Sequence, residues 1–285
     1  MQRFAAVGAL ALGVICISIS AVLVLLANVG APASAFYRLG FAAVVLVPVW
    51  FVRERARVPR SVWPLLLTSG ACFAVDILCF NAAVPMTSAA TATLLGNNAP
   101  LAVGLGAALF FRERQPLAFW IGLIVAIAGS IVIVGGDALR AGGNVAGDAL
   151  AVTAALAFGG YLLVTQRLRL ELGTFSLTTF SIATSTLILY AFAASVHAPL
   201  GGFTTHAWLA LAALGVFSQL IGYLAISYAL GHLPASVVSA TLLLQGPLTA
   251  LVAFIVLGQA VSWATFAGGL LVLAGVLTVN LARVR

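Results

Sequence analysis

The 285-residue sequence contains no lysine, so its 13 basic residues are all arginines. Because the phosphate-binding loop Gly-x-x-x-x-Gly-Lys needs a lysine, the sequence excludes this type of ATP-binding site. Charged residues of all types make up only 7% of the chain, whereas apolar residues make up 63% and the mean hydropathy is +1.20. A soluble protein of this length would need a far more polar surface. The composition therefore predicts an integral membrane protein.

Residue types that bind metals or perform catalysis are also scarce. Cys16, Cys72 and Cys79 all lie in apolar stretches, where thiols behave as small hydrophobic groups. No disulfide, metal site or cofactor is predicted. The three histidines are not obviously paired with an acid or a hydroxyl, and no His-Glu-x-x-His spacing occurs. An intramembrane enzyme is therefore the alternative function class that the sequence favours less than transport.

Apolar runs of about 20 residues, the length that a helix needs to cross a bilayer, repeat along the chain. Runs such as Leu123 to Val134 do not alternate between polar and apolar residues as the strands of a membrane β-barrel would. We therefore expect an all-α integral membrane protein with almost no domain outside the bilayer. The ten predicted transmembrane helices lie near 4–28, 35–52, 62–84, 88–111, 117–136, 148–167, 174–194, 206–229, 234–257 and 262–281.

The arginines are distributed unevenly among the joints between these spans. If the N-terminus is cytoplasmic, the cytoplasmic segments hold every arginine except Arg140 and Arg38, and Arg38 falls inside a span. This asymmetry follows the positive-inside rule and predicts that both termini are cytoplasmic. The same arginines produce the formal net charge of +7. An anionic lipid leaflet is a suitable partner for that charge, and we expect no nucleic-acid partner.

The two halves of the chain resemble each other. Residues 81–129 align with residues 227–275 at a near-constant offset, which places residues 98–100 over residues 245–247. If each half contains five spans, the two copies cross the membrane in opposite directions, as in secondary transporters with inverted repeats. We therefore predict a first repeat at 1–136, a connecting loop at 137–147 and a second repeat at 148–285.

Short motifs recur in the same order in both halves. The first half contains TSAATA at 87–92, Pro100, LFFRER at 109–114 and WIG at 120–122, and the second contains LPASVV at 233–238, Pro247 and VLGQ at 256–259. This ordered set resembles the EamA repeat of the drug/metabolite transporter superfamily. In length and span count the chain is similar to the YddG-type amino-acid exporters of that superfamily. The resemblance implies ten helices in two inverted five-helix bundles around a central cavity, and export of small metabolites across a bacterial inner membrane.

Pro100 and Pro247 are predicted to break two spans near the middle of the membrane. Proline cannot donate a hydrogen bond to the carbonyl four residues earlier, so the carbonyls of Gly96 and Leu243 should be free. Free carbonyls at this depth are tolerated only beside protein or a water-lined cavity. The two breaks therefore indicate where a substrate could bind.

Amide side chains accompany both predicted breaks. Asn97, Asn98 and Gln245 add hydrogen-bond donors and acceptors at the same depth. On one interpretation they bind the charged groups of a zwitterionic substrate. On the other they form hydrogen bonds between helices and only hold the bundle together.

Asp76 is the only acid well inside a predicted span. A carboxylate at this depth is costly and by default indicates a function. Arg38, about one turn into the second span, is its candidate ion-pair partner. Asp76 is thus either a proton acceptor that couples export to a proton gradient, a substrate ligand, or a structural group that is paired or protonated.

Other polar and aromatic side chains are candidates for the cavity wall. Gln219 and Tyr223 lie four residues apart in the eighth span and share a helix face. Phe80, Asn81 and Tyr161 are further candidates. Packing of the helix core would also account for the aromatic residues.

Together these features predict a secondary transporter that exports a small metabolite, with a neutral or aromatic amino acid as the favoured substrate. We expect a monomer in the lipid bilayer, working by alternating access and driven by a gradient, with protons as the candidate coupling ion, or transporting passively. Efflux of cationic drugs is the alternative within transport. The small multidrug relatives rely on an acid in their first span, and residues 4–28 contain none.

Overall fold

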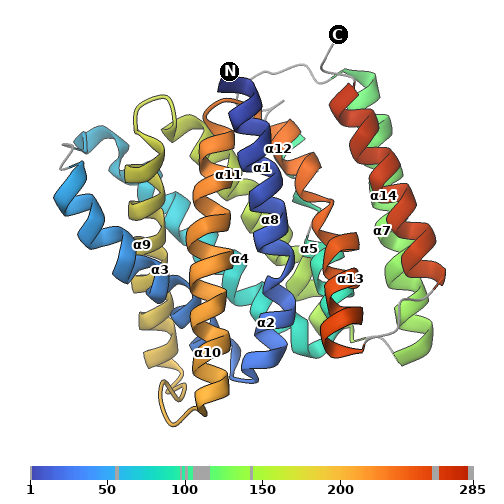
Figure 1. Ribbon diagram of the computed structural model, residues 1–285, viewed down its shortest axis with the longest axis horizontal. Helices are drawn as coiled ribbons and strands as arrows, with labels where there is room; N and C mark the ends of the chain where they lie inside the picture. The colour runs from blue at the N-terminus through green and yellow to red at the C-terminus, as the bar shows by residue number, and fades with distance from the viewer. Residues whose placement is uncertain are drawn as a thin grey trace.

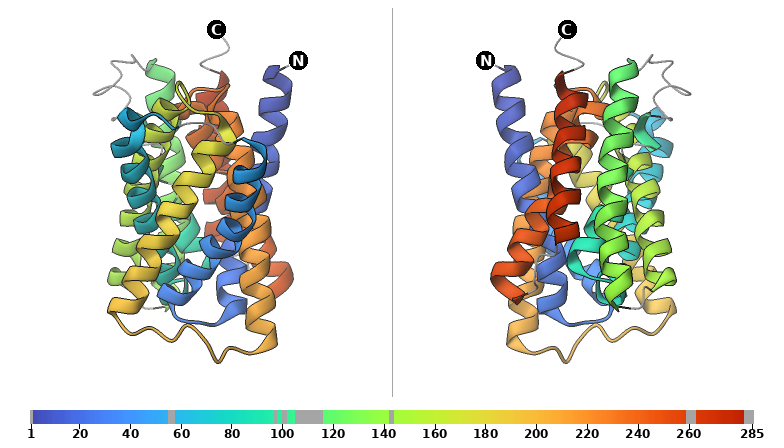
Figure 2. Two further views of the ribbon diagram at one scale, coloured as in Figure 1. Left: turned by 90° about the vertical axis from the view of Figure 1, so that its left-hand side faces the viewer. Right: turned by 90° about the vertical axis from the view of Figure 1, so that its right-hand side faces the viewer.

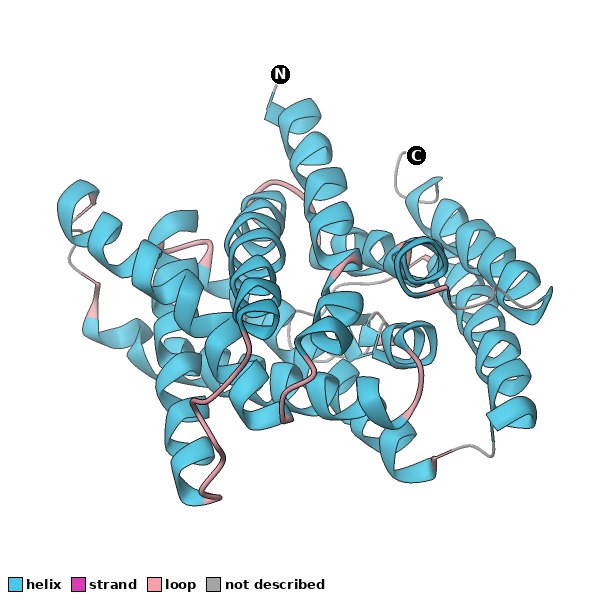
Figure 3. Ribbon diagram, turned by 60° about the horizontal axis from the view of Figure 1, so that its bottom comes forward, coloured by secondary structure: helices cyan, strands magenta, loops and turns pink. Residues whose placement is uncertain are grey.

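The computed structural model describes residues 2–54, 58–96, 98–99, 102–104, 116–141, 144–258 and 263–281. Over these ranges the chain forms helices joined by turns and loops, with no strand (Figure 3). The prediction of an all-α protein is confirmed for this part of the chain. The helices are α1 (Gln2–Ser18), α2 (Ser20–Ala27), α3 (Ala31–Arg53), η1 (Arg60–Val62), α4 (Trp63–Met86), α5 (Ala89–Gly96), α7 (Leu117–Ala141), α8 (Val145–Leu168), α9 (Thr174–Ser195), α10 (Thr205–Ala213), η2 (Leu214–Gly222), α11 (Tyr223–Leu230), α12 (Ala235–Leu242), α13 (Gln245–Leu257) and α14 (Trp263–Leu281).

The long helices run along a common direction and form one bundle (Figures 1 and 2). Helix α1 begins and α14 ends at the upper end in Figure 1, whereas the loop between α9 and α10 lies at the lower end. Helices α3 and α9 lie at one side of the bundle, and α7 and α14 lie at the other. The two ends of the described chain thus lie at the same end of the bundle.

Six helical stretches of the described chain are long and apolar enough to cross a membrane. Their outward side chains are large and apolar: Leu187 is 70% exposed and Ile255, on a shorter apolar helix, is 71% exposed. Such a surface suits lipid and would be unusual in water. The protein is therefore a multi-pass membrane protein. The six stretches are Arg3–Ala27, Ala31–Arg53, Arg60–Met86, Ala146–Leu168, Thr174–Ser195 and Thr205–Leu230, and the shorter apolar helices are Leu117–Val132, Gln245–Leu257 and Phe266–Gly275.

Helices from the first half of the chain (up to Ala141) pack mainly against helices from the second half (from Asn144). Helix α3 packs against α9, α4 against α8, α5 against α13 and α7 against α14, while α1 contacts α11 and η2. The largest buried cluster combines side chains from α1, α3, α4, α8, α9, α11 and α12. The centre of the bundle is therefore built by both halves together.

Glycines allow α7 and α14 to pack closely. A Cβ atom placed on Gly129 would lie 2.6 Å from the carbonyl oxygen of Gly268, and one placed on Gly275 would clash with the carbonyl oxygen of Gly122. Small residues at such positions let helix backbones approach closely in a membrane, where van der Waals packing drives association. These glycines therefore fix how near the two helices lie.

The loop predicted at 137–147 is shorter in the structure. Helix α7 continues to Ala141, and α8 begins at Val145. Asn144 caps α8, because its side-chain oxygen accepts a hydrogen bond from the backbone N–H of Gly147 at 3.2 Å. With this cap, α8 begins three residues before the predicted sixth span at 148–167.

Candidate functional site

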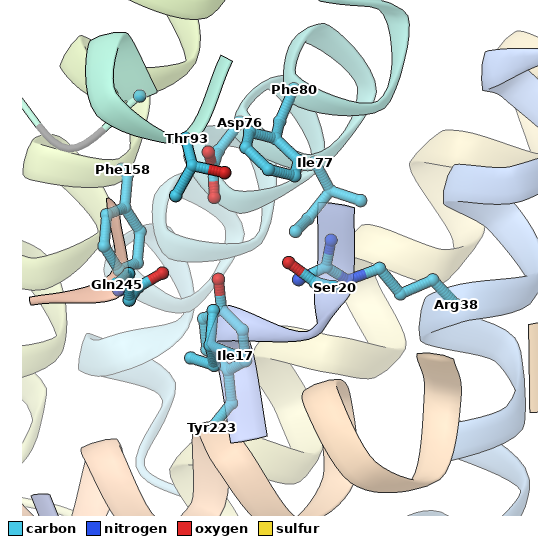
Figure 4. Close-up of a pocket in the computed structure, with 11 residues that line it drawn as sticks. Ile17, Ser20, Arg38, Asp76, Ile77, Phe80, Thr93, Phe158, Tyr223 and Gln245 are labelled. Atoms are coloured by element: carbon cyan, nitrogen blue, oxygen red, sulfur yellow. The ribbon is translucent and has the colours of Figure 1, made fainter. Parts of the chain in front are cut away.

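A small cavity lies between helices of both halves (Figure 4). Its volume of about 30 Å³ is room for a few water molecules. Figure 4 shows the side chains of Arg38, Asp76 and Gln245 converging on this space from α3, α4 and α13. The cavity is lined by Ile17, Ser20, Arg38, Asp76, Ile77, Phe80, Thr93, Gly96, Phe158, Tyr223 and Gln245.

Arg38 is fully buried and held by neutral groups. Its Nε donates to Oε1 of Gln219 at 3.1 Å, its Nη1 to Oδ1 of Asn81 at 3.5 Å, and its Nη2 to the Ser218 hydroxyl at 3.3 Å. Asn81 is itself fixed, because its Nδ2 donates to the Ser34 hydroxyl at 2.7 Å. The guanidinium is therefore held in place by neutral acceptors, and no carboxylate of the described residues forms an ion pair with it.

Asp76 lies near the middle of α4 and is 7% exposed. Its carboxylate forms no hydrogen bond or ion pair with any other residue that the structure describes, although it lines the same cavity as Arg38. The structure thus brings the two predicted partners to one cavity but records no ion pair between them. Each charged group can therefore be contacted by a third group in the cavity.

Three other polar side chains of the cavity wall also have no hydrogen-bond partner among the described residues. They are the hydroxyls of Ser20 and Tyr223 and the amide of Gln245, all at least 95% buried. Buried polar groups are normally hydrogen-bonded, and those that are not need an explanation such as water or a ligand. The cavity is therefore chemically suited to hold polar contents.

The aromatic candidates divide between the cavity wall and the layer behind it. Phe80 and Tyr223 line the cavity, as does Phe158, which the sequence did not single out. Tyr161 does not line it: its ring stacks on Phe73 at 4.5 Å between centroids, with the planes at 20°. Tyr161 therefore occupies the packed core next to the cavity.

The predicted break in the ninth span is present, but its details differ from the prediction. Helix α12 ends at Leu242 and α13 begins at Gln245, which places Pro247 in the first turn of α13, where no N–H is needed. The carbonyl of Leu243 accepts a hydrogen bond from the N–H of Gly246 at 3.2 Å. The prediction of a free Leu243 carbonyl is therefore wrong, because the turn between the helices satisfies it.

The corresponding break in the first half is only partly described. Helix α5 ends at Gly96, which lines the cavity, whereas Asn97 and Pro100 lie outside the described residues. Asn98 does not line the cavity. Its Nδ2 donates to the carbonyl of Leu95 at 3.1 Å, and its buried Oδ1 has no partner among the residues that the structure describes.

Two further irregularities in the helices next to the cavity were not predicted from the sequence. Residues 214–222 form the π-helix η2, which presents Ser218 and Gln219 to Arg38. The first span is interrupted at Ile19, between α1 and α2, next to the cavity residues Ile17 and Ser20. π-Helical turns inside α-helices are frequent at functional sites.

The interruption at Ile19 is tied to the second half by one hydrogen bond. The Thr249 hydroxyl on α13 donates to the carbonyl of Ser18 at 2.8 Å. The Thr249→Val variant should leave this buried carbonyl without its donor and lower stability by about 1 kcal/mol, measured by thermal unfolding in detergent. Thr278→Val is the control, because that exposed hydroxyl bonds only within its own helix. Equal effects of the two variants would contradict this prediction.

Comparisons with known proteins agree with this architecture. The model of the EamA-like transporter family matches residues 4–135 and again residues 145–281. The chain is 25% identical to the uncharacterized transporter YwfM of Bacillus subtilis, over 87% of this chain and 83% of that protein. It is 32% identical to a probable terminal-alkyne amino-acid exporter of Streptantibioticus cattleyicolor, over 67% of this chain and 64% of that protein.

One solved crystal structure of a protein superposes with a TM-score of 0.79 at 20% identity, over 97% of this chain and 96% of that one. At this identity the match shows a shared fold. Because the family model matches both halves and covers most of the sequence, the chain belongs to the EamA-like transporter family.

Proposed function

We propose that this protein is a secondary transporter that exports a small zwitterionic metabolite, a neutral or aromatic amino acid, across a bacterial inner membrane. The observation that carries the proposal is the cavity between the two halves, in which Arg38, Asp76 and polar groups without a hydrogen-bond partner among the described residues face a common space. Its remaining wall, which includes Phe80 and Phe158, is mostly apolar. Such a mixture suits a ligand with a charged head and an apolar side chain.

The helix packing supports ten spans in two inverted repeats, 1–136 and 148–285. On this division α3 and α7 pack against their own counterparts α9 and α14. The contact of α4 with α8 is likewise the counterpart of the contact of α1 with η2 and α11. This is the pattern that a pseudo-two-fold axis in the membrane plane would produce. We propose that both termini are cytoplasmic and that the monomer is the transporting unit.

The cavity in this conformation is too small for an amino acid. Alternating access therefore requires the helices around it to move. The interruptions at Ile19, at η2 and between α12 and α13 all adjoin the cavity. Short irregular segments of this kind absorb the backbone changes of hinge motion, and we propose that they let the cavity open to each side in turn.

Efflux of an organic cation is the second candidate function, and one observation favours it. The Asp76 carboxylate has no partner among the described residues and could bind a cation. The positive charge of Arg38 in the same wall opposes a substrate that carries only positive charge. A zwitterion satisfies both groups, so we place amino-acid export first.

Thermal unfolding of the purified protein with a panel of ligands tests the proposed function. A ligand that binds only the folded protein raises its stability, by about 2.7 kcal/mol at a hundred times its Kd. We expect neutral or aromatic amino acids to raise the melting temperature and a quaternary ammonium compound not to do so. Stabilisation by the cation alone would support drug efflux, and no effect of any amino acid would contradict the proposal.

A further inference from the structure

We propose that Arg38 and Asp76 are the two poles of one substrate site, with Arg38 binding the carboxylate and Asp76 binding the ammonium group of a zwitterion. This inference rests on the proposed function and names the groups that would recognise the substrate. It assigns to each charge a separate role in binding, in place of the structural ion pair that was one of the alternatives left open by the sequence.

The first step is that neutral acceptors hold the Arg38 guanidinium in a fixed orientation, while no described carboxylate forms an ion pair with it. A charged side chain in a membrane-spanning segment normally pairs with an opposite charge. Arg38 instead uses three of the five N–H donors of a guanidinium on the neutral acceptors Asn81, Ser218 and Gln219. Two N–H groups, one on each terminal nitrogen, are left for a further acceptor. A guanidinium with its position fixed and its charge free is suited to bind a carboxylate.

The second step is that the opposite charge, Asp76, is in the same wall and forms no hydrogen bond or ion pair with any described residue. Asp76 and Arg38 are the buried charged residues of the described chain. Both line the cavity, and Figure 4 shows their charged groups directed toward the space between them. Burying two opposite charges without a direct ion pair between them is costly. A ligand that carries both opposite charges would compensate both at once.

The third step is the surroundings of the two charges. The Ser20 hydroxyl and the Gln245 amide also face the cavity, have no hydrogen-bond partner among the described residues, and can complete the hydrogen bonds of a charged head group. Ile17, Ile77 and Phe80 supply apolar surface next to them. This arrangement matches an α-amino acid whose side chain is apolar, once the cavity has widened.

Three ligands separate the two poles experimentally. Phenylalanine carries both charges, phenylalanine amide carries only the ammonium group, and N-acetylphenylalanine carries only the carboxylate. Affinities are measured by ligand-dependent thermal unfolding or calorimetry on the full-length protein. We expect the wild-type protein to bind phenylalanine at least about tenfold more tightly than either analogue, because each analogue loses one charge-assisted interaction.

Each of two variants should lose the preference of the wild-type protein for phenylalanine over one analogue and keep its preference for phenylalanine over the other. Arg38→Gln should bind phenylalanine and its amide alike while still discriminating against the N-acetyl compound. Asp76→Asn should bind phenylalanine and the N-acetyl compound alike while still discriminating against the amide. Arg167→Gln and Asp148→Asn are matched controls, because these substitutions make the same charge changes outside the cavity. Both control variants should bind the three ligands with the same order of affinity as the wild-type protein.

The outcomes distinguish this inference from the proposed function. If no amino acid binds the wild-type protein, the proposed function itself fails. If phenylalanine binds but the two variants keep the wild-type preferences, the charges form a structural pair and the two-pole site is wrong. Should the variants not fold, the wild-type series decides: equal affinity for all three ligands would overturn the inference, and the expected order would support it.

Discussion

The Asp76→Asn variant is expected to lose all transport that a pH gradient drives. An amide cannot take up and release a proton, and Asp76 is the buried acid that faces the cavity among the described residues. In proteoliposomes with an imposed pH gradient, we expect the wild-type protein to accumulate the amino acid above its equilibrium level. The variant should only equilibrate it, even at substrate concentrations high enough to offset weaker binding.

Two comparisons make this result specific. Asp148→Asn replaces an acid in the first turn of α8, away from the cavity, and should accumulate substrate like the wild-type protein. If Asp76→Asn accumulates substrate normally in response to the pH gradient, Asp76 is not the coupling group. If the wild-type protein itself only equilibrates substrate at every gradient, transport is passive and protons are not the coupling ion.

The Gly275→Leu variant is expected to be the most destabilising single substitution in the contact between α7 and α14. Even a Cβ atom at this position would clash with the carbonyl oxygen of Gly122 and lie 2.7 Å from the backbone nitrogen of Ala126. Because backbone atoms cannot move aside as a side chain can, the two helices must separate. Overpacking of this kind costs about 1–3 kcal/mol or more. We expect the melting temperature in detergent to fall by roughly 5–10 °C.

Gly8→Leu is the matched control for that experiment. Gly8 also lies within a helix, α1, but no atom lies within 4 Å of a Cβ placed there. This variant should unfold within about 1–2 °C of the wild-type protein, because surface substitutions change stability by only about 0.5 kcal/mol. Similar melting temperatures for both variants would show that close packing of α7 and α14 contributes little to stability.

The candidate site combines predicted and unpredicted features. The sequence identified Asp76, Phe80, Tyr223 and Gln245 as cavity residues, and all four line the cavity. Asn81 and Gln219 were also singled out, but they lie behind the cavity wall, where they hold Arg38. Their polarity was visible in the sequence, whereas their role depends on which neighbour they meet.

The helix irregularities also show that the sequence predicts local features but not those that depend on contacts between distant residues. A proline marked the break before α13, because its missing N–H is a local property of the chain. No proline or glycine marks the interruption at Ile19, where the Ser18 carbonyl is satisfied by the hydroxyl of Thr249 on α13. The sequence gives no local signal for the π-helix η2 either. Features that depend on a contact with a distant helix could not be predicted from their own segment.

The sequence by itself determined that this is a helical membrane protein with repeated motifs, because hydrophobicity, helix length and proline positions act within each segment. Only the tertiary structure decided that Arg38 is held by neutral groups and that Asp76 faces the same cavity without an ion pair to any described residue. Arg38 and Gln219 are 181 residues apart in sequence. Which polar groups meet depends on the rotation and depth of each helix, and these are set by the packing of all the helices together.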